Sequence, residues 1–332
     1  MKRRVYSILS AAVLLLTMLM CGCEYQKNEN GDRLSIVTTC FPPYDFARAV
    51  TGDTADITML LSTGAEAHSY EPTPLDIAKI QQCDVFICVG GEGEVWVDKI
   101  LDSIDTSSIE VIRLFDYVKP LEEEEIDGAS PNGHSHGHNH DHDHNHDHNH
   151  DHDGAGVGYD EHIWTSPVNA QLCVKGIEDA LCSEFSQNSE IYHKNAENYT
   201  VRLSELDENF REMTANAPEN LIIVGDRFPF RYLAHEYGLE YFAAFSGCSS
   251  ESEPSVRTMA YLIDEILEHD TDVVFCLEFS TRKLAERLSD ATGAKILPLH
   301  SCNNVSKDDF ESGVTYIELM YENLNNLREA LY

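Results

Sequence analysis

Positive charge is scarce in this sequence of 332 residues. Lys and Arg number 23 against 58 Asp and Glu, which leaves a formal net charge of −35. Such a chain repels nucleic acid and the headgroups of anionic lipids, so both are excluded as charge partners, and it attracts cations. Because 42% of its residues are apolar, the chain is nevertheless expected to be globular rather than disordered.

Several motifs of metal sites and enzymes are absent. No CxxC pair occurs among the ten cysteines, which argues against a zinc knuckle built from thiolates. The sequence has no HExxH and no GxxxxGK[ST], so neither a protease of the zincin type nor an ATP site is expected. A metal site in this chain must be assembled from residues that lie far apart in the sequence.

A long apolar run occurs only at the N-terminus. After a basic start, "ILSAAVLLLTMLM" is short for a membrane span and typical of an export signal, although an uncleaved anchor helix is the alternative. The run ends in "LMCGCEY", which resembles a bacterial lipoprotein processing box, with Cys23 as the lipidated residue and Cys21 as the weaker candidate. We expect a signal peptide over 1–22, a polar tether over 23–33, and an extracytoplasmic protein anchored to the cell membrane by lipid.

Short β-branched runs alternate with helical patterns in two halves of the chain. The predicted strands are "LSIVTT", "ADITMLL", "DVFICVG" and "EVIRLFD", then "LIIVGD", "LEYFAAFS", "DVVFCLEF" and "AKILPLH". Thr73, Pro74 and Asp76 mark one helix start with the pattern of a capping box. The alternation predicts the α/β class with two lobes, in which ligands gather at the carboxyl ends of the strands.

A long amphipathic helix is predicted between these halves, from about Ser189 to Ala217. Its apolar positions recur at alternating intervals of four and three residues, at Tyr192, Ala196, Tyr199, Leu203, Leu206, Phe210 and Met213. Such a helix spans about 40 Å, and it has too few heptads to favour a coiled coil. We therefore predict an N-terminal lobe over 34–187, a rigid bridging helix over 188–217 and a C-terminal lobe over 218–332.

A histidine occupies every second position in part of segment 133–153. These residues are His134, His136, His138, His140, His142, His144, His146, His148, His150 and His152. Asp, Asn, Gly and Ser fill the gaps, so the segment cannot build a core and is expected to be a mobile loop that binds metal ions loosely. An expression tag is the rival explanation, which the internal position and the Asp and Asn residues argue against.

The six other histidines divide into two groups. His193, His235 and His269 lie within or at the ends of predicted helices beside charged residues, and we expect them on the solvated surface. The remaining three, His68, His162 and His300, lie in predicted loops or at a strand end, where the binding residues of a scaffold usually collect.

Two segments around these histidines resemble a known family. "GAEAHSYEPTPLDIAKIQQCDVFICVGGEGEVWVDKIL" is similar to the first-ligand segment of the zinc and manganese solute-binding lipoproteins of bacterial ABC importers, the ZnuA-like family, and "YDEHIWTSPVNA" is similar to its second-ligand segment. The resemblance extends over nearly all of the chain after the signal, including the long helix and the histidine-rich insert. It implies the metal-binding type of periplasmic-binding-protein-like fold, with two lobes and a metal ion in the cleft.

The resemblance also implies the metal ligands. The first two fall on His68 and His162, and the third falls on Asp226, where the family has His or Glu. The Asp226 segment carries one extra residue before "FRYLAHEYGL", and a helix cap is the alternative role for its carboxylate. The fourth position, usually Asp or Glu in the family, falls on His300 near the end of "AKILPLHSCNN". Independently of the resemblance, Glu278 lies at the end of a predicted strand that faces the same cleft, and it is the reserve ligand.

Three imidazoles and one carboxylate suit a tetrahedral Zn²⁺ site, whereas Mn²⁺ prefers more oxygen ligands. Glu66 and Glu161 are candidates for acids that orient the ligands, with exposed surface roles as the alternative. We therefore predict a monomeric, non-enzymatic receptor that captures Zn²⁺ and delivers it to the permease of an ABC importer. The alternatives are a manganese receptor of the same family, a secreted zinc hydrolase, and an adhesive surface protein or metal buffer.

The eight cysteines beyond the lipoprotein box are expected to have different states. Five lie in apolar runs and are predicted to be buried thiols: Cys40, Cys88, Cys173, Cys182 and Cys276. Cys248 and Cys302 lie in polar segments, and export from the cytoplasm permits oxidation, so we predict a disulfide between them.

Overall fold

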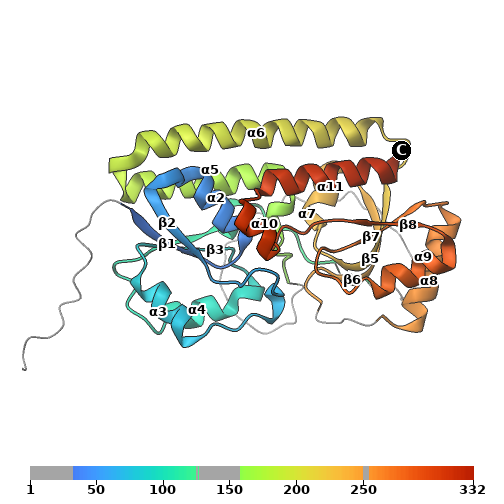
Figure 1. The fold of residues 1–332 in the computed structure, drawn as a ribbon, viewed down its shortest axis with the longest axis horizontal. Helices are drawn as coiled ribbons and strands as arrows, with labels where there is room; N and C mark the ends of the chain where they lie inside the picture. The colour runs from blue at the N-terminus through green and yellow to red at the C-terminus, as the bar shows by residue number, and fades with distance from the viewer. Residues whose placement is uncertain (1–32, 125, 127–157, 250–253) are drawn as a thin grey trace, which may run out of the picture. The chain divides into compact units, whose positions relative to one another are not determined.

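The fold is that of a computed structural model, which describes residues 33–124, 126, 158–249 and 254–332 (Figure 1). Cys23 and the histidine run lie outside these ranges. The residues from Leu34 to Tyr332 form one folded unit. Within the described ranges, no helix combines the length and the apolar character that a membrane span requires.

The first half of this unit is built on a sheet of four parallel strands in the order β2-β1-β3-β4. The strands are β1 (Leu34–Thr38), β2 (Ala55–Met59), β3 (Val85–Cys88) and β4 (Glu110–Arg113). Helix α2 (Phe41–Thr51) packs on one face, while α3 (Pro74–Gln82) and α4 (Val95–Leu101) cover the other (Figure 1). Strands covered on both faces are expected to be continuously apolar, and all four residues of β3 are buried.

The second half repeats this arrangement, with four parallel strands in the order β6-β5-β7-β8. They are β5 (Leu221–Phe228), β6 (Glu240–Ser246), β7 (Val273–Cys276) and β8 (Lys295–Pro298). The helices of this half are α7 (Arg231–Tyr237), α8 (Val256–Glu268), α9 (Lys283–Thr292), α10 (Lys307–Ser312) and α11 (Tyr316–Leu331). In both sheets the first strand of the half is internal and the second strand forms an edge, so the two lobes share one topology.

All eight predicted strands are present, and all except β5 lie within the predicted runs. The prediction ended this strand at Asp226, but β5 continues to Phe228 with a shift of register between Val224 and Arg227. Such a bulge places an extra residue in one strand and redirects the side chains beside it. The extra residue noted in the sequence therefore lies next to a predicted ligand.

The long predicted helix is α6 (Ser189–Asn216), and its buried side chains are the seven of the predicted apolar stripe. It packs against α5 (Pro167–Glu184), α2 and α11. In Figure 1, α6 runs along both sheets, with α5 beside it over the first sheet and α11 beside it over the second. One apolar cluster contains Phe46 of α2, Phe210 of α6 and Leu327 of α11. The predicted fold class, two βα lobes bridged by a long helix, is confirmed.

Candidate metal centre

His68 lies in a short 3-10 turn, Ala67–Ser69 (η2), in the connection between β2 and α3. The end of this connection is fixed by the predicted capping box. The Thr73 hydroxyl accepts a hydrogen bond from the Asp76 N–H (3.3 Å), and the Asp76 carboxylate accepts one from the Thr73 N–H (3.0 Å). The helix start predicted from the sequence thus anchors the loop that carries the first predicted ligand.

His162 directly precedes the 3-10 turn Ile163–Thr165 (η5), which leads into α5. Its side chain is only 2% exposed. Asp160 Oδ1 accepts a hydrogen bond from the His162 N–H (2.8 Å) and lies 3.2 Å from Nδ1 of the ring, while the Thr165 hydroxyl donates to the His162 carbonyl (2.8 Å). A carboxylate on one ring nitrogen fixes the orientation of an imidazole and leaves the other nitrogen free to bind a ligand.

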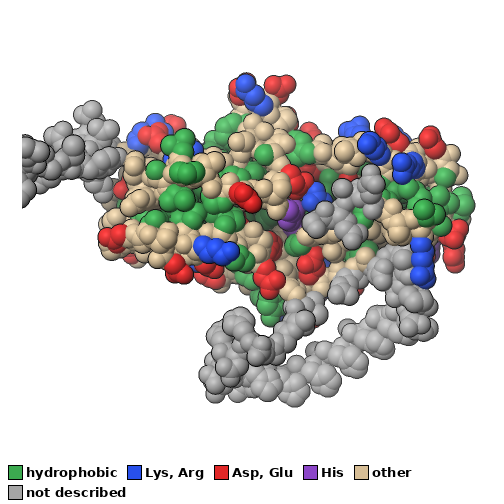
Figure 2. Space-filling model, turned by 90° about the horizontal axis from the view of Figure 1, so that it is seen from below, with side chains coloured by type: hydrophobic (Ala, Val, Ile, Leu, Met, Phe, Trp, Pro, Cys, Tyr) green, Lys and Arg blue, Asp and Glu red, His purple; other side chains and the backbone are tan. Residues whose placement is uncertain are grey.

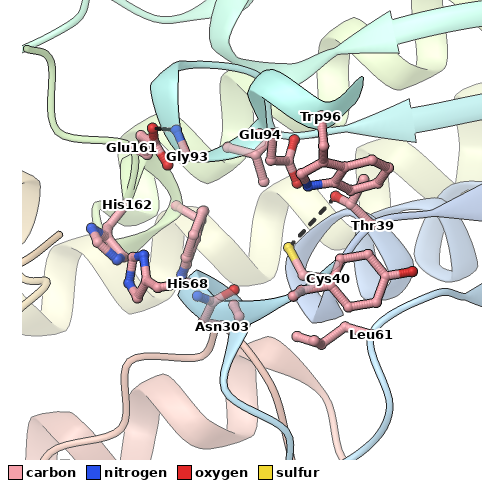
Figure 3. A pocket seen from close by; sticks show the side chains of 14 residues that line it. Thr39, Cys40, Leu61, His68, Gly93, Glu94, Trp96, Glu161, His162 and Asn303 are labelled. Atoms are coloured by element: carbon pink, nitrogen blue, oxygen red, sulfur yellow. Dashed lines mark hydrogen bonds between the residues drawn. The ribbon is translucent and has the colours of Figure 1, made fainter. Parts of the chain in front are cut away.

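The two imidazoles are neighbours, with ring centroids 5.5 Å apart (Figure 3). His68 is exposed on one side, but the side chains packed around its ring exclude part of the solvent. This desolvation, together with the nearby His162 and Arg227, lowers the pKa of His68 to about 4, so this ring is neutral at neutral pH. Burial acts in the same direction on His162, but the charge of Asp160 outweighs it and raises the pKa of His162. A neutral imidazole offers the lone pair that a metal ion requires.

A cavity between the lobes brings further polar residues to this pair. It is lined by His68 and His162 from the first half and by Asp226, Glu278 and Ser301 from the second. In the space-filling view a histidine lies at the bottom of a hollow that has acidic and basic side chains around it (Figure 2). Residues far apart in the sequence therefore meet at one cavity between the lobes. Ligands of sheets with parallel strands usually bind at the carboxyl ends of those strands, where this cavity lies.

Asp226 lies in the irregular part of β5 and lines this cavity. Its Oδ1 accepts a hydrogen bond from the Arg227 N–H (2.9 Å), whereas its Oδ2 is buried and has no hydrogen-bond partner. A buried carboxylate oxygen without a partner is costly unless a cation or a donor reaches it. The alternative role as a helix cap is wrong, because the N-cap of α7 is Phe230 and no side chain caps it.

Glu278 follows β7 and lines the cavity, whereas His300 is not among the residues that line it. Ser301 fixes the Glu278 carboxylate through its N–H (3.0 Å) and its hydroxyl (2.6 Å). His300 Nδ1 accepts a hydrogen bond from the Cys302 N–H (2.9 Å) and lies 3.6 Å from Glu278. Of the two candidates for the fourth ligand, the geometry favours Glu278.

The donors of the cavity form an open arrangement. Among the described residues, one group of His, Cys, Asp or Glu side chains has three ligand atoms within 4.8 Å of one another. That group contains no residue of this cavity. A metal ion held by side chains of both lobes would therefore have to draw His68, His162, Asp226 and Glu278 closer together.

A family model confirms the relationship that the sequence segments implied. The model described as zinc-uptake complex component A, periplasmic (ZnuA), matches residues 36–330. The chain belongs to the ZnuA family.

Curated relatives and a solved structure agree with this assignment. The chain is 32% identical over 320 residues to the zinc-binding lipoprotein AdcA of Streptococcus pneumoniae, a match that covers 95% of this chain but only 59% of AdcA. It is also 32% identical to the high-affinity zinc uptake system protein ZnuA of Bacillus subtilis. This match covers 96% of this chain and 95% of that protein. The Zn(II)-bound ZnuA-like domain of S. pneumoniae AdcA superposes with a TM-score of 0.71 at 30% identity, covering 90% of this chain and 99% of the domain.

Sequence reasoning missed several polar residues of this ZnuA-family cavity, among them Arg227 and Asn303. The Arg227 guanidinium pairs with Glu66 (2.5 Å), so its charge is balanced by a carboxylate of the other lobe. Asn303 also lines the adjoining cavity with His68 and His162 (Figure 3), and its carbonyl accepts a hydrogen bond from the Phe41 N–H (3.1 Å). Two features of the sequence could have indicated them. Arg227 lies in the segment that carries the extra residue before "FRYLAHEYGL", and Asn303 lies in the polar run after β8.

Glu66 and Glu161 were each predicted either to orient the metal ligands or to be exposed surface acids. Glu66 holds Arg227, and its pKa is lowered although burial opposes this, because Arg227 donates to its carboxylate. Glu161 is 8% exposed and accepts a hydrogen bond from the Gly93 N–H, so the alternative of an exposed surface role is wrong for this residue. Glu161 instead holds the loop after β3 against the segment that carries His162.

The predicted disulfide between Cys248 and Cys302 is wrong, because both residues are free thiols. Cys302 is fully buried, and its thiol faces the His300 carbonyl (3.7 Å). Cys248 is half-buried, and its N–H donates to Glu123 (3.0 Å). Each thiol thus has its own surroundings, and the polar residues next to Cys302 in the sequence concealed its burial.

Replacing Glu94, in the wall of the adjoining cavity, by glutamine is expected to change the pH dependence of stability. Burial, aided by the charge of Glu161, raises the pKa of Glu94 from 4.5 to about 7. Between these values the unfolded chain loses the proton and the folded chain keeps it, so the native protein loses up to about 3 kcal/mol as the pH rises from 4.5 to 7. Urea unfolding at pH 5 and pH 8 should show that Glu94→Gln removes most of this loss, and an unchanged difference between the two pH values would contradict the assignment.

Proposed function

We propose that this chain is an extracytoplasmic receptor that captures Zn²⁺ in the cavity between its lobes. The observation that carries the proposal is the pair of neighbouring imidazoles, His68 and His162, next to the buried and unpartnered Oδ2 of Asp226. Glu278 is the favoured fourth ligand because it lines the cavity, and His300, the original prediction, is better placed to orient it.

The donor set favours zinc over manganese. Two imidazole nitrogens and two carboxylate oxygens match a tetrahedral Zn²⁺ shell with distances of about 2.0–2.2 Å. Mn²⁺ is better served by more oxygens in a larger shell. The names of the relatives support the same choice, because AdcA is described as zinc-binding and ZnuA as a zinc uptake protein. A manganese receptor of the same family is the alternative.

Capture is proposed to be followed by delivery to the permease of an ABC importer, with a monomeric receptor held at the membrane by lipid on Cys23. The family description as a component of a zinc-uptake complex supports such a partner. A zinc hydrolase would require an open coordination position for water and a general base. Four protein ligands would close the shell, so we do not propose an enzyme.

Metal analysis of the purified chain without 133–153, followed by competition, tests this function. We expect one tightly bound Zn²⁺ per chain, and we expect that an equal concentration of Mn²⁺ will not displace it. Displacement by Mn²⁺ would favour the manganese receptor. Absence of any tightly bound divalent ion would refute the receptor, and hydrolysis of ester, peptide or phosphate substrates would favour the enzyme.

Deleting segment 133–153 is expected to remove weak metal sites and to leave the tight one. Its ten histidines alternate with polar residues, and such imidazoles exchange ions quickly, so we propose that the run collects Zn²⁺ for the cleft. Calorimetric titration of the intact and shortened chains, both with Zn²⁺, measures the two classes of site. Loss of the tight site on deletion would show that the run is part of it.

A further inference from the structure

A second group of metal-type ligands lies away from the cleft, at the turn between α5 and α6. Glu178 and Cys182 are one helical turn apart on α5, and His193 lies near the start of α6. The short connection over 185–188 folds the second helix back along the first. In Figure 1 this turn lies at the end of the helix pair that is remote from the second sheet. The group therefore shares no residue with the cleft.

The three side chains are close enough to bind one ion. One ligand atom from each of Glu178, Cys182 and His193 lies within 4.8 Å of the other two, and no other such set occurs among the described residues. Cys182 Sγ is 3.8 Å from Nε2 of His193, and the Glu178 carboxylate contacts Nδ1 of the same ring. In a tetrahedral zinc site with bonds of about 2.0–2.3 Å, ligand atoms lie about 3.3–3.8 Å apart. The two contacts use different nitrogens of the His193 ring, so binding one ion requires a rotation of the His193 or Glu178 side chain together with a contraction of the group.

The surroundings of the group suit an ion that arrives from solvent. Glu178 is 7% exposed and is held in the helix pair, Cys182 is half-buried, and His193 is exposed. Thiolate and imidazole select zinc-like ions over Mg²⁺ and Ca²⁺, and a buried carboxylate adds charge. Lys175 Nζ lies 3.5 Å from Glu178, but its nearer partner is Asp179. Part of the coordination shell would remain open to water.

This group departs in part from the sequence predictions. Cys182 was expected to be buried, but its position near the end of α5 leaves it half exposed; the surface position predicted for His193 is confirmed. Cys182 and His193 are eleven positions apart in the sequence, and only the tight turn between the helices brings them together. No spacing motif for zinc describes such an arrangement.

We propose that Glu178, Cys182 and His193 form a second site for a soft divalent cation such as Zn²⁺. With three protein ligands and an open side, it binds more weakly than the cleft and completes its shell with water. The site gives the receptor a place for an ion on the first lobe that is independent of the cleft and of the histidine run.

Co²⁺ titration of the full chain carrying His68→Ala and His162→Ala tests this site. Those substitutions disable the proposed cleft, and a thiolate bound to Co²⁺ gives a charge-transfer band in the near ultraviolet that histidine ligands do not give. Because the histidine run also takes up Co²⁺, we expect the intensity of the band at saturation, rather than the amount of Co²⁺ added, to correspond to one Co²⁺–thiolate bond per chain. The band should disappear when Zn²⁺ is added. Absence of the band would overturn the proposal. Because the cleft ligands are already missing, this result is independent of whether the cleft binds zinc.

Further variants assign the band to the group. Cys182→Ser should abolish it, and His193→Ala should weaken Co²⁺ binding by at least about tenfold. The matched control is Cys248→Ser, which removes another half-buried thiol outside the group and should leave the band unchanged. A band that survives Cys182→Ser, or that is lost in Cys248→Ser, would refute the site.

Alkylation of the unsubstituted chain gives a second measurement that does not depend on how the variants fold. Mass spectrometry after treatment with iodoacetamide should show that Zn²⁺ slows the modification of Cys182 by at least about tenfold, because a metal-bound thiolate is withdrawn from reaction. The rate at Cys248 serves as the internal reference. Equal rates at Cys182 with and without Zn²⁺ would contradict the proposal.

Discussion

Replacing His162 by alanine is expected to weaken Zn²⁺ binding by more than about 100-fold. Loss of residues that only orient a ligand costs about 10- to 100-fold in metal affinity, and loss of the ligand itself should exceed that. His162 is 2% exposed and is held by Asp160 on one ring nitrogen. Among the described residues, His68 is the only other histidine that lines this cavity, and it alone cannot hold an ion that both imidazoles are proposed to share.

The measurement is competition with a chelating indicator, made on the chain without 133–153 so that weak sites do not obscure the result. His235→Ala is the matched control, because His235 is an exposed histidine on α7 and its loss should leave the affinity unchanged. His68→Ala should give a loss similar to that of His162→Ala. A change of less than about threefold for His162→Ala, or an equal loss for the control, would remove His162 from the ligand set.

The elements of the fold could be predicted because they depend on short-range patterns. The stripe of α6 follows the 3.6-residue period of a helix with one buried face, and all seven of its predicted positions are buried. The capping box at Thr73 needs only residues within four positions of one another. The β-branched runs form parallel strands because helices cover both faces of each sheet.

The candidate site was less predictable because it depends on the direction of loop side chains. His68 and His162 were predicted as ligands through the motifs around them, not through any period in the sequence, and the structure places both at one cavity. Asp226 was predicted as a ligand from the resemblance, and it lines the cavity although a bulge in β5 redirects the chain there. The same bulge brings Arg227 into the cavity, and its signal in the sequence was the extra residue of this segment. Periodicity gives no information about such irregular positions.

The choice between Glu278 and His300 as fourth ligand also could not be made from the sequence, because it depends on local turns after the strands. Both residues lie just beyond a strand of the second sheet, so both were expected near its carboxyl edge. Cys302, two residues after His300, has a positive φ of 60°, and its N–H donates to the His300 ring. This local turn draws the imidazole back toward its own loop, and the neighbouring Ser301 fixes the Glu278 carboxylate at the cavity.

Asp45 is the buried polar residue whose loss is expected to cost the most stability. It lies on α2 and is 1% exposed. Its Oδ2 accepts hydrogen bonds from the Tyr199 hydroxyl of α6 (2.7 Å) and from the N–H of Tyr316 at the start of α11 (2.9 Å), and its Oδ1 pairs with Arg48. Arg48 in turn donates to the Val314 carbonyl (2.7 Å). One carboxylate thus joins α2 of the first lobe to the bridging helix α6 and to the start of α11.

Replacing Asp45 by alanine is expected to lower the free energy of unfolding by about 3–5 kcal/mol, because the half-buried Arg48 and two buried donors lose their common acceptor. Tyr199→Phe removes a single hydrogen bond of the same group and should cost only about 1 kcal/mol. Urea unfolding followed by circular dichroism compares the two variants at one pH. If Asp45→Ala costs no more than Tyr199→Phe, the carboxylate does not connect these helices energetically, and the apolar contacts of α6 and α11 alone hold the two lobes together.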